Sequence, residues 1–420
     1  MGHEDARPPG ASSASCRNLK VRYLIFDAFG FGGTVRAVLS VANYLAGRNY
    51  DVEIISIMRW REKPVFSIDP RITIRVLNDT GNWKPRRWLN WRLLATAGAR
   101  LLTRSSLIHP DDEAYGLFSR LTDARLLRYF KRIASGVLIT TRASLNLFAA
   151  RHVAPSVIKV GQEHLPSQRY TQRLRRDIRD KYPQLDALVT LTESDRNEYA
   201  KMLGDAPACL LTVPNPVPQM LPRQATPDQK VLVAAGRFVP QKGFDLLIEA
   251  FARVAVRRPD WTLKIFGNGP DREKLQQMIE DRGLRGRALL MEASTTIEEE
   301  FAQASVYVLS SRFEGFPMVV LEAMGCGLPV VGFDCPTGPR DIIRHGEDGL
   351  LVERENVAAL AESLLGLMED PEKRKRLGAR ARASVQRFAI EVIGPRWVEL
   401  IEALSRSKGV AASQHGAAGK

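Results

Sequence analysis

The 420-residue sequence contains only four cysteines and no Cys-x-x-Cys pair; they are Cys16, Cys209, Cys326 and Cys335. This scatter argues against a disulfide framework or a zinc site and favours a reducing compartment. No apolar run reaches the ~18 residues that a membrane-spanning helix needs. The N-terminus is polar and lacks the apolar stretch of a signal peptide. We therefore expect a cytoplasmic protein with disordered segments at residues 1–19 and 405–420.

Two common phosphate-binding motifs are missing as well. Gly30, Gly32 and Gly33 form a turn between a predicted strand at 21–26 and a predicted helix at 35–48. Strand, glycine turn and helix in this order let a backbone approach a phosphate. The spacing, however, is not Gly-x-Gly-x-x-Gly, and no Lys-Ser/Thr follows as in a Walker loop. A tight turn that binds no ligand explains these glycines equally well.

The sequence has fewer acidic than basic residues. The chain has 61 Lys and Arg against 47 Asp and Glu, which gives a net charge of +14. A protein this basic favours acidic partners, such as nucleic acid, anionic lipid or a phosphorylated substrate.

One basic segment, Asn82 to Arg104, contains no acidic residue. It holds Trp83, Trp88 and Trp91 together with Lys84, Arg86, Arg87, Arg92, Arg100 and Arg104. Tryptophan beside arginine on an amphipathic helix is typical of a membrane surface or of a binding site for a polyanionic acceptor. The alternative, equally weighted, is that the tryptophans belong to the core and the arginines to a solvated face.

The hydrophobic pattern alternates strands and helices twice along the chain. Strands are predicted at 21–26, 51–56, 72–76, 137–140, 157–160, 187–191 and 208–213, and again at 231–235, 262–266, 288–291, 306–309 and 330–333. A proline-rich linker, 215–229, separates the two series. We therefore expect an α/β protein with two Rossmann-like domains facing across a cleft. They would span 20–214 and 230–387, with a C-terminal helix at 388–404 that crosses back to the first domain.

The stretch from Ser310 to Glu322 carries two carboxylates. It follows the predicted strand 306–309, and Pro317 is expected at the first helical position. Loops at the carboxyl ends of parallel strands bind ligands, and a helix N-terminus favours an anion. A lone glutamate on a helix is usually solvated. Glu322, however, lies in a very apolar segment, where a charge is costly without a partner, and a carboxylate there can accept hydrogen bonds from a diol.

Two cations occupy a similar position in the same half. Arg237 and Lys242 follow the predicted strand 231–235, beside Gly236. An arginine fork and a lysine point charge suit a diphosphate. Surface charge is the alternative in a chain this basic, but the pairing of two cations at one strand end with two carboxylates at another favours a binding site.

In the first half, His164 comes shortly after the predicted strand 157–160. A histidine at this place can orient a substrate hydroxyl, although most histidines are structural.

Taken together, these motifs resemble the retaining glycosyltransferases of family 4, which have the GT-B fold. The resemblance covers about residues 21–404. It rests on Arg237 with Lys242, on the Glu-x-seven-Glu segment Glu314 to Glu322, on Gly32-Gly33 with Arg36, and on the run from Cys335 to Ile343.

The resemblance implies a role for each site residue. Glu322 would hold the nucleotide ribose, and Arg237 and Lys242 would neutralise the donor diphosphate. Glu314 and His164 would face the transferred sugar, although the sequence Gln-Glu-His is not the commonest form of the histidine motif. The donor would also contact Gly32, Gly33, Arg36, Gly236, Gly315, Phe316, Pro317, Met318 and Val319.

The implied reaction needs no cofactor other than its co-substrate, a nucleotide sugar, with a UDP-hexose or UDP-N-acetylhexosamine favoured. The acceptor would be a cell-envelope glycan, a glycolipid or a polymer, reached from the cytoplasm or from the inner face of the membrane. No Asp-x-Asp pair stands at a convincing strand end, so we expect no metal. No carboxylate stands out as a nucleophile, although Glu314 stays open as one.

Two other classes remain as alternatives: a non-catalytic basic protein that binds membranes or polyanions, and a dinucleotide-dependent oxidoreductase. The first leaves the pairing of cations and carboxylates unexplained, and the second lacks its glycine fingerprint.

Overall fold

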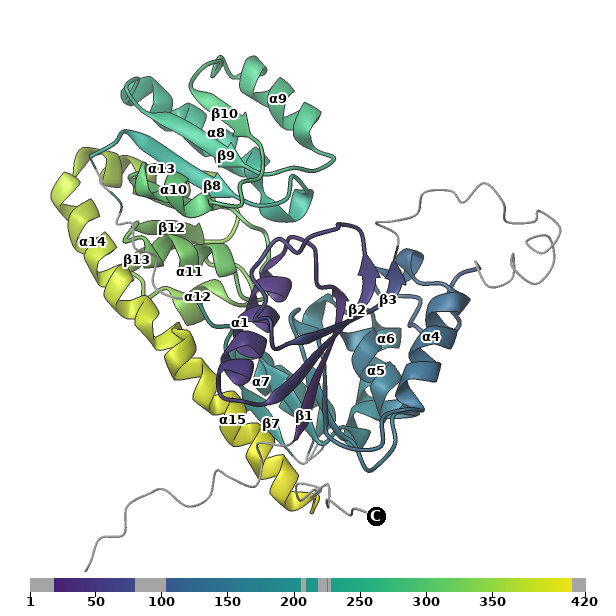
Figure 1. Cartoon of the computed structure of the whole chain (residues 1–420). Helices are drawn as coiled ribbons and strands as arrows, with labels where there is room; N and C mark the ends of the chain where they lie inside the picture. The colour runs from purple at the N-terminus through teal and green to yellow at the C-terminus, as the bar shows by residue number, and fades with distance from the viewer. Residues whose placement is uncertain (1–18, 80–102, 205–208, 218–224, 226–227, 410–420) are drawn as a thin grey trace, which may run out of the picture.

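The computed structural model describes residues 19–79, 103–204, 209–217, 225 and 228–409. The chain forms two α/β domains, each built on a parallel sheet with helices on its faces (Figure 1). The predicted fold class is therefore confirmed.

The first domain is built on a sheet with the strand order β3-β2-β1-β4-β5-β6-β7. Its described strands are β1 (Lys20–Asp27), β2 (Asp51–Arg59), β3 (Thr73–Asp79), β4 (Val137–Thr140), β5 (Ile158–Gln162), β6 (Ala187–Thr190) and β7 (Leu210–Thr212). Its helices are α1 (Gly33–Gly47), η2 (Tyr115–Leu117), α4 (Arg120–Phe130), α5 (Ala143–His152), η3 (Ser167–Arg169), α6 (Gln172–Lys181), η4 (Tyr182–Gln184) and α7 (Glu193–Leu203).

The second domain has the strand order β10-β9-β8-β11-β12-β13. Its strands are β8 (Val231–Ala235), β9 (Thr262–Phe266), β10 (Ala288–Met291), β11 (Val306–Leu309), β12 (Val330–Phe333) and β13 (Gly349–Val352). Its helices are η5 (Pro240–Lys242), α8 (Phe244–Arg257), α9 (Arg272–Asp281), α10 (Ile297–Ala302), α11 (Met318–Gly325), α12 (Pro339–Ile342), α13 (Val357–Glu369), α14 (Pro371–Ser384) and η6 (Val385–Phe388).

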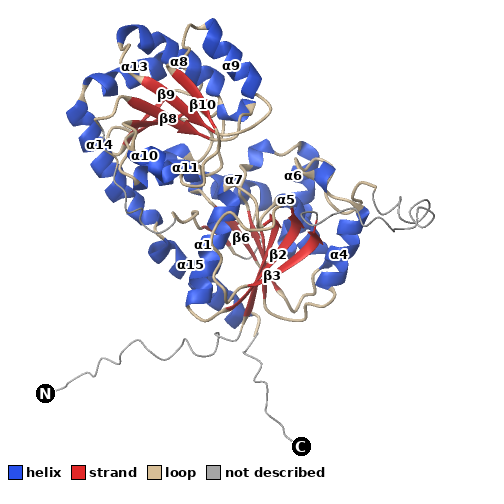
Figure 2. Cartoon of the chain, turned by 45° about the horizontal axis from the view of Figure 1, so that its top comes forward, coloured by secondary structure: helices blue, strands red, loops and turns tan. Residues whose placement is uncertain are grey.

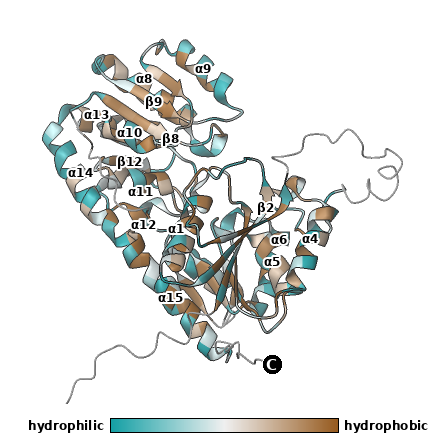
Figure 3. Cartoon of the chain, viewed as in Figure 1, coloured by the Kyte–Doolittle hydropathy of each residue, from teal (hydrophilic) through white to brown (hydrophobic). Residues whose placement is uncertain are grey.

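Both sheets are hydrophobic because helices cover them on both faces. All four residues of β4, β6, β11 and β12 are buried, as expected of central parallel strands. Figure 3 shows hydrophobic residues along β8 and β9 and hydrophilic ones on α9. Strand β13, which pairs with β12, was not predicted, because its short apolar run gave no strand signal of its own.

The last helix, α15 (Ile390–Ser407), returns to the first domain and packs against α1 (Figure 1). Trp397 is 1% exposed and lies in the core of the first sheet. We expected disorder from residue 405, but α15 continues to Ser407, so this boundary was placed too early. Lys408 then anchors its end, with Nζ donating to the carbonyls of Pro155 and Val157 and to the Asp186 carboxylate.

None of the described helices combines the length and the apolar composition needed to cross a bilayer. The basic segment Asn82 to Arg104 lies almost wholly outside the described residues, which resume at 103. Its predicted membrane contact stays a prediction.

Candidate active site

The loop that follows β11 meets the first domain. Helix α11, which this loop enters, lies beside α1 of the first domain (Figures 1 and 2). A Cβ added to Gly315 would lie 2.2 Å from the His164 carbonyl oxygen, so only glycine permits this approach. A Cβ on Gly33, at the start of α1, would likewise lie 2.9 Å from the Met318 side chain. The predicted glycines therefore allow the two domains to touch at this loop.

Pro317 is the residue before α11, not its first residue. Its backbone is extended, with ψ 95°, and the helix begins at Met318. The predicted boundary is thus wrong by one residue. Phe316 and Met318 are buried at 7% and 5% exposure, and Val319 is partly buried.

Lys242 and Glu314 form a close ion pair at the strand ends. Lys242 Nζ lies 2.6 Å from Glu314 Oε1, and the Ser311 hydroxyl donates to the same oxygen at 2.6 Å. Glu314 is buried, with 6% exposure. The cation and the carboxylate that the sequence paired by position are therefore direct neighbours, and Glu314 holds the lysine head in place.

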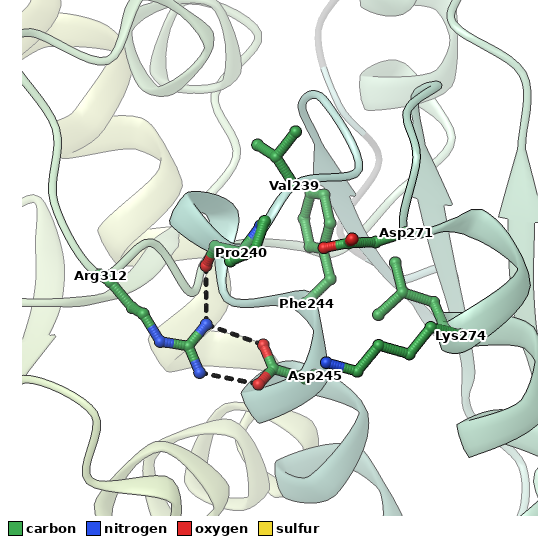
Figure 4. Close-up of a pocket in the computed structure, with 8 residues that line it drawn as sticks. Val239, Pro240, Phe244, Asp245, Asp271, Lys274 and Arg312 are labelled. Atoms are coloured by element: carbon green, nitrogen blue, oxygen red, sulfur yellow. Dashed lines mark hydrogen bonds and ion pairs between the residues drawn. The ribbon is translucent and has the colours of Figure 1, made fainter.

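The loops after β8 and β11 are tied into one platform. Arg312 Nη1 donates to the Pro240 carbonyl at 2.7 Å, and the Arg312 guanidinium also grips the Asp245 carboxylate (Figure 4). Gln241 Nε2 donates to the Phe313 carbonyl, and the Ser310 hydroxyl donates to the Lys242 carbonyl. Because these bonds join both loops, Lys242 and Glu314 are held in a fixed relation.

A pocket of about 110 Å³ lies beside this platform (Figure 4). Its lining includes Val239, Pro240, Phe244, Asp271, Lys274 and Arg312. Figure 4 shows the Arg312 guanidinium of this pocket bonded to Pro240 and Asp245, and its Nε also lies 3.3 Å from Glu355 Oε2. We therefore assign the pocket no ligand.

Arg237 is exposed and makes no ion pair with any residue in the described part of the chain. Gly236 brings the backbone close to Lys242, since a Cβ there would lie 3.2 Å from the lysine side chain. Gly243 has φ +59°, and a Cβ there would lie 2.0 Å from the Ser310 carbonyl oxygen. The turn that carries both cations thus depends on glycine.

Arg36 joins the two domains through two carboxylates. Its Nη1 lies 2.7 Å from Glu322 Oε1, and its Nη2 lies 2.6 Å from Glu298 Oε1 on α10. Glu322 is 6% exposed, and burial raises its pKa to about 7 against the opposing charge of Arg36. The buried carboxylate of Glu322 therefore has a charged partner, Arg36, although it lies in an apolar helix; the sequence suggested that such a partner was needed.

His164 lies at the carboxyl end of β5, facing the second domain. It is half-buried, and its Nε2 is inaccessible and has no hydrogen-bond partner among the described residues. Burial, reinforced by the charge of Arg142, lowers the pKa of His164 to about 3. The imidazole is therefore neutral at physiological pH and can donate or accept a hydrogen bond without carrying charge.

Several contact residues were missed. Glu298 belongs to a run of three glutamates that looks solvated in the sequence. Arg169 stacks on the Phe313 ring at 3.7 Å, and the Thr337 hydroxyl donates to Asp195 across the domain boundary. No local pattern marks these residues, because each partner comes from the other domain. No group of three potential metal ligands occurs in the described part of the chain.

A family comparison agrees with this geometry. Residues 221–384 match the model of the glycosyl transferases group 1 family. This match covers nearly all of the second domain. It contains every predicted site residue of the second half, including Arg237, Lys242, Glu314 and Glu322.

Whole-chain comparisons extend the likeness to the first domain. An exopolysaccharide phosphotransferase of Streptomyces coelicolor is 38% identical over 395 residues, which cover 92% of this chain but 41% of that protein. The chain thus spans less than half of that relative. An uncharacterized glycosyltransferase of Haemophilus influenzae is 27% identical over 90% of this chain and 98% of its own length. A poly(glycerol-phosphate) alpha-glucosyltransferase of Bacillus subtilis is 26% identical over 55% of this chain and 35% of its length.

Solved structures show the same two-domain fold. Staphylococcus aureus TarM, crystallised with UDP, superposes with a TM-score of 0.72 at 17% identity over 91% of this chain and 99% of its own. Sucrose-phosphate synthase from Thermosynechococcus elongatus gives 0.73 at 16% identity over 93% and 100%. The two domains of this chain therefore have the GT-B fold.

Proposed function

We propose that this chain is a retaining glycosyltransferase. It would transfer a hexose or N-acetylhexosamine from a UDP-sugar to a hydroxyl of a cell-envelope glycan, glycolipid or polymer, without a metal. The observation that carries the proposal is the pairing of Lys242 with Glu314, and of Arg36 of the first domain with Glu322, in and beside a domain that matches the group 1 family.

Glu322 would bind the donor ribose. Arg36 takes one carboxylate oxygen, Oε1, and Oε2 has no hydrogen-bond partner among the described residues. A carboxylate fixed through one oxygen can present the other to a ribose hydroxyl. In this proposal Arg36 acts through Glu322, rather than on the diphosphate directly.

The donor diphosphate would lie between Lys242, Arg237 and the N-terminus of α11. Both cations follow β8, and α11 presents the unpaired N–H groups and positive dipole end that favour an anion. Preorganised charge of this kind usually supplies the largest catalytic effect. Gly32 and Gly33 would let the backbone of the first domain approach the same diphosphate.

In the proposed reaction, the bond between the anomeric carbon and the diphosphate oxygen breaks, and the diphosphate takes the electron pair. The acceptor oxygen attacks the anomeric carbon on the same face and passes its proton to the leaving phosphate oxygen. Glu314 is occupied by Lys242 and Ser311, which favours a positioning role over nucleophilic attack. His164, neutral at physiological pH, would face the transferred sugar.

The preference for UDP and for an envelope acceptor comes from the relatives. TarM was crystallised with UDP, and the B. subtilis relative is named as a glucosyltransferase for poly(glycerol phosphate). The S. coelicolor relative is named a phosphotransferase, but this chain matches only 41% of it. It matches 98% of the H. influenzae glycosyltransferase, so we favour glycosyl transfer over phosphoryl transfer.

A thermal-shift panel of UDP-, GDP-, ADP- and TDP-sugars tests the donor assignment. A ligand that binds only the folded protein raises its melting temperature by mass action. We expect a UDP-sugar to give the largest shift. A shift with NAD but with no nucleotide sugar would favour the oxidoreductase alternative instead.

A further inference from the structure

A buried carboxylate lies next to His164 and has no part in the proposed chemistry. Glu163 is 3% exposed and follows β5 directly. Its Oε2 accepts a hydrogen bond from the Tyr170 hydroxyl at 2.7 Å. Its Oε1 accepts from Asn146 Nδ2 at 2.9 Å and from the Tyr182 hydroxyl. The carboxylate is thus held from α5, from η4 and from Tyr170.

The bond to Tyr170 closes a short loop. Glu163 begins the segment 163–170 and Tyr170 ends it, seven residues later. Between them, the backbone turns through η3 with few hydrogen bonds of its own, from Arg169 N to Pro166 O and from Tyr170 N to Ser167 O. The side-chain bond therefore joins the two ends of the loop at its base.

This loop faces the second domain at both ends. The His164 carbonyl packs against Gly315, and the Arg169 guanidinium stacks on Phe313 at 3.7 Å. Phe313 and Gly315 flank Glu314. A shift of the loop by a fraction of an ångström would therefore move the His164 ring relative to Lys242 and Glu314.

We propose that Glu163 is a positioning residue for glycosyl transfer. By accepting the Tyr170 hydroxyl it ties the loop 163–170 and holds His164 and Arg169 against the Glu314 loop. The proposal rests on the proposed function, since it assigns Glu163 a role in that reaction and no contact with either substrate.

An ionised carboxylate at Glu163 does not stabilise the fold. Burial raises the pKa of Glu163 to about 7, against the hydrogen bonds from Tyr182, Tyr170 and Asn146 that lower it. Asp112 and Arg142 are the charged groups next to Tyr170. The pKa of Glu163 is higher in the folded protein than in the unfolded chain, so the unfolded chain loses this proton first as pH rises. The free energy of unfolding therefore falls between about pH 4.5 and about pH 7. A neutral glutamine would avoid this loss.

Two tyrosines provide a matched test. Tyr170→Phe and Tyr182→Phe each remove one hydroxyl from the same carboxylate, but only Tyr170 closes the loop. We expect Tyr170→Phe and Glu163→Gln to lower kcat about tenfold or more, the scale of a hydrogen bond to a charged group. Tyr182→Phe should leave kcat near wild type. We also expect the melting temperature of Glu163→Gln to fall less than that of the wild type between pH 5 and pH 7.5.

Hydrogen–deuterium exchange of the full chain separates this proposal from the proposed function. Peptides covering 163–170 should exchange faster in Tyr170→Phe than in Tyr182→Phe, whether or not a donor has been found. If the wild type turns over no nucleotide sugar, the proposed function fails while the exchange result still decides the loop tie. Equal exchange in both variants, or normal kcat in folded Tyr170→Phe and Glu163→Gln, would overturn the proposal.

Discussion

Arg36 Nη1 and Glu322 Oε1 lie 2.7 Å apart although the two residues are 286 positions apart in the sequence. The arginine belongs to the first domain and the glutamate to the second. The proposed ribose site is therefore completed from the other domain. Glu298 holds the second nitrogen of the same guanidinium, so Arg36 bridges two carboxylates at the domain boundary.

The first prediction concerns pH. In the proposed function Glu322 would accept ribose hydrogen bonds best when ionised, and burial raises its pKa to about 7. The ionised fraction therefore falls as pH drops below 7, and we expect UDP affinity to fall with it, by up to about tenfold per pH unit. Calorimetric titration with UDP at pH 6, 7 and 8 measures this. The Glu322→Gln variant should bind weakly and lose the part of the pH dependence that Glu322 supplies.

The second prediction concerns Arg36. Without its charge, the buried Glu322 should protonate at a higher pH, so Arg36→Ala should bind UDP at least about tenfold more weakly at pH 7. Part of the lost UDP affinity should be recovered at pH 8.5, where more of Glu322 is ionised. Arg48→Ala is a matched control, because Arg48 caps the other end of α1 and stacks on Tyr44. Unchanged UDP affinity in Arg36→Ala would show that Glu322 does not depend on the bridge.

These contacts define the limit of what the sequence could predict. Continuous apolar runs located β4, β6, β11 and β12, since a central parallel strand is hydrophobic on both faces. Glu314, Glu322, Arg237 and Lys242 could be placed at strand ends from local order alone. The Arg36–Glu298 pair and the Glu163–Tyr170 tie could not, because each depends on packing between elements that no periodicity encodes. The helix end at Ser407 was missed for the same reason, since Lys408 is held by the first domain.

The third prediction concerns the two cations. Lys242→Ala and Arg237→Ala should each lower turnover by about two orders of magnitude, the scale for losing one preorganised charge donor. Lys230→Ala is the control, because Lys230 lies before β8 and pairs with Asp260. Steady-state kinetics with the best donor measures all three. Near-normal turnover in folded Lys242→Ala would remove the proposed diphosphate site.

The fourth prediction concerns membrane attachment. The segment Asn82 to Arg104 carries six basic residues and three tryptophans without an acid. Basic residues near an anionic leaflet contribute about 1 kcal/mol each. We expect the protein to co-sediment with anionic liposomes at low salt and to be released at high salt. Changing Arg86, Arg87 and Arg92 to Gln should weaken this binding, whereas equal binding to neutral vesicles would contradict it.

The proposed metal-independent glycosyl transfer is tested most directly by measuring release of nucleoside diphosphate from a panel of nucleotide sugars, with EDTA present and without an added acceptor. Some hydrolysis is expected of a transferase with a formed donor site. We predict slow UDP release from one UDP-sugar by the wild type, undiminished by EDTA, and at least about 100-fold less from Lys242→Ala. Absence of release from every nucleotide sugar by the folded wild type, or release only with added Mg²⁺ or Mn²⁺, would contradict it.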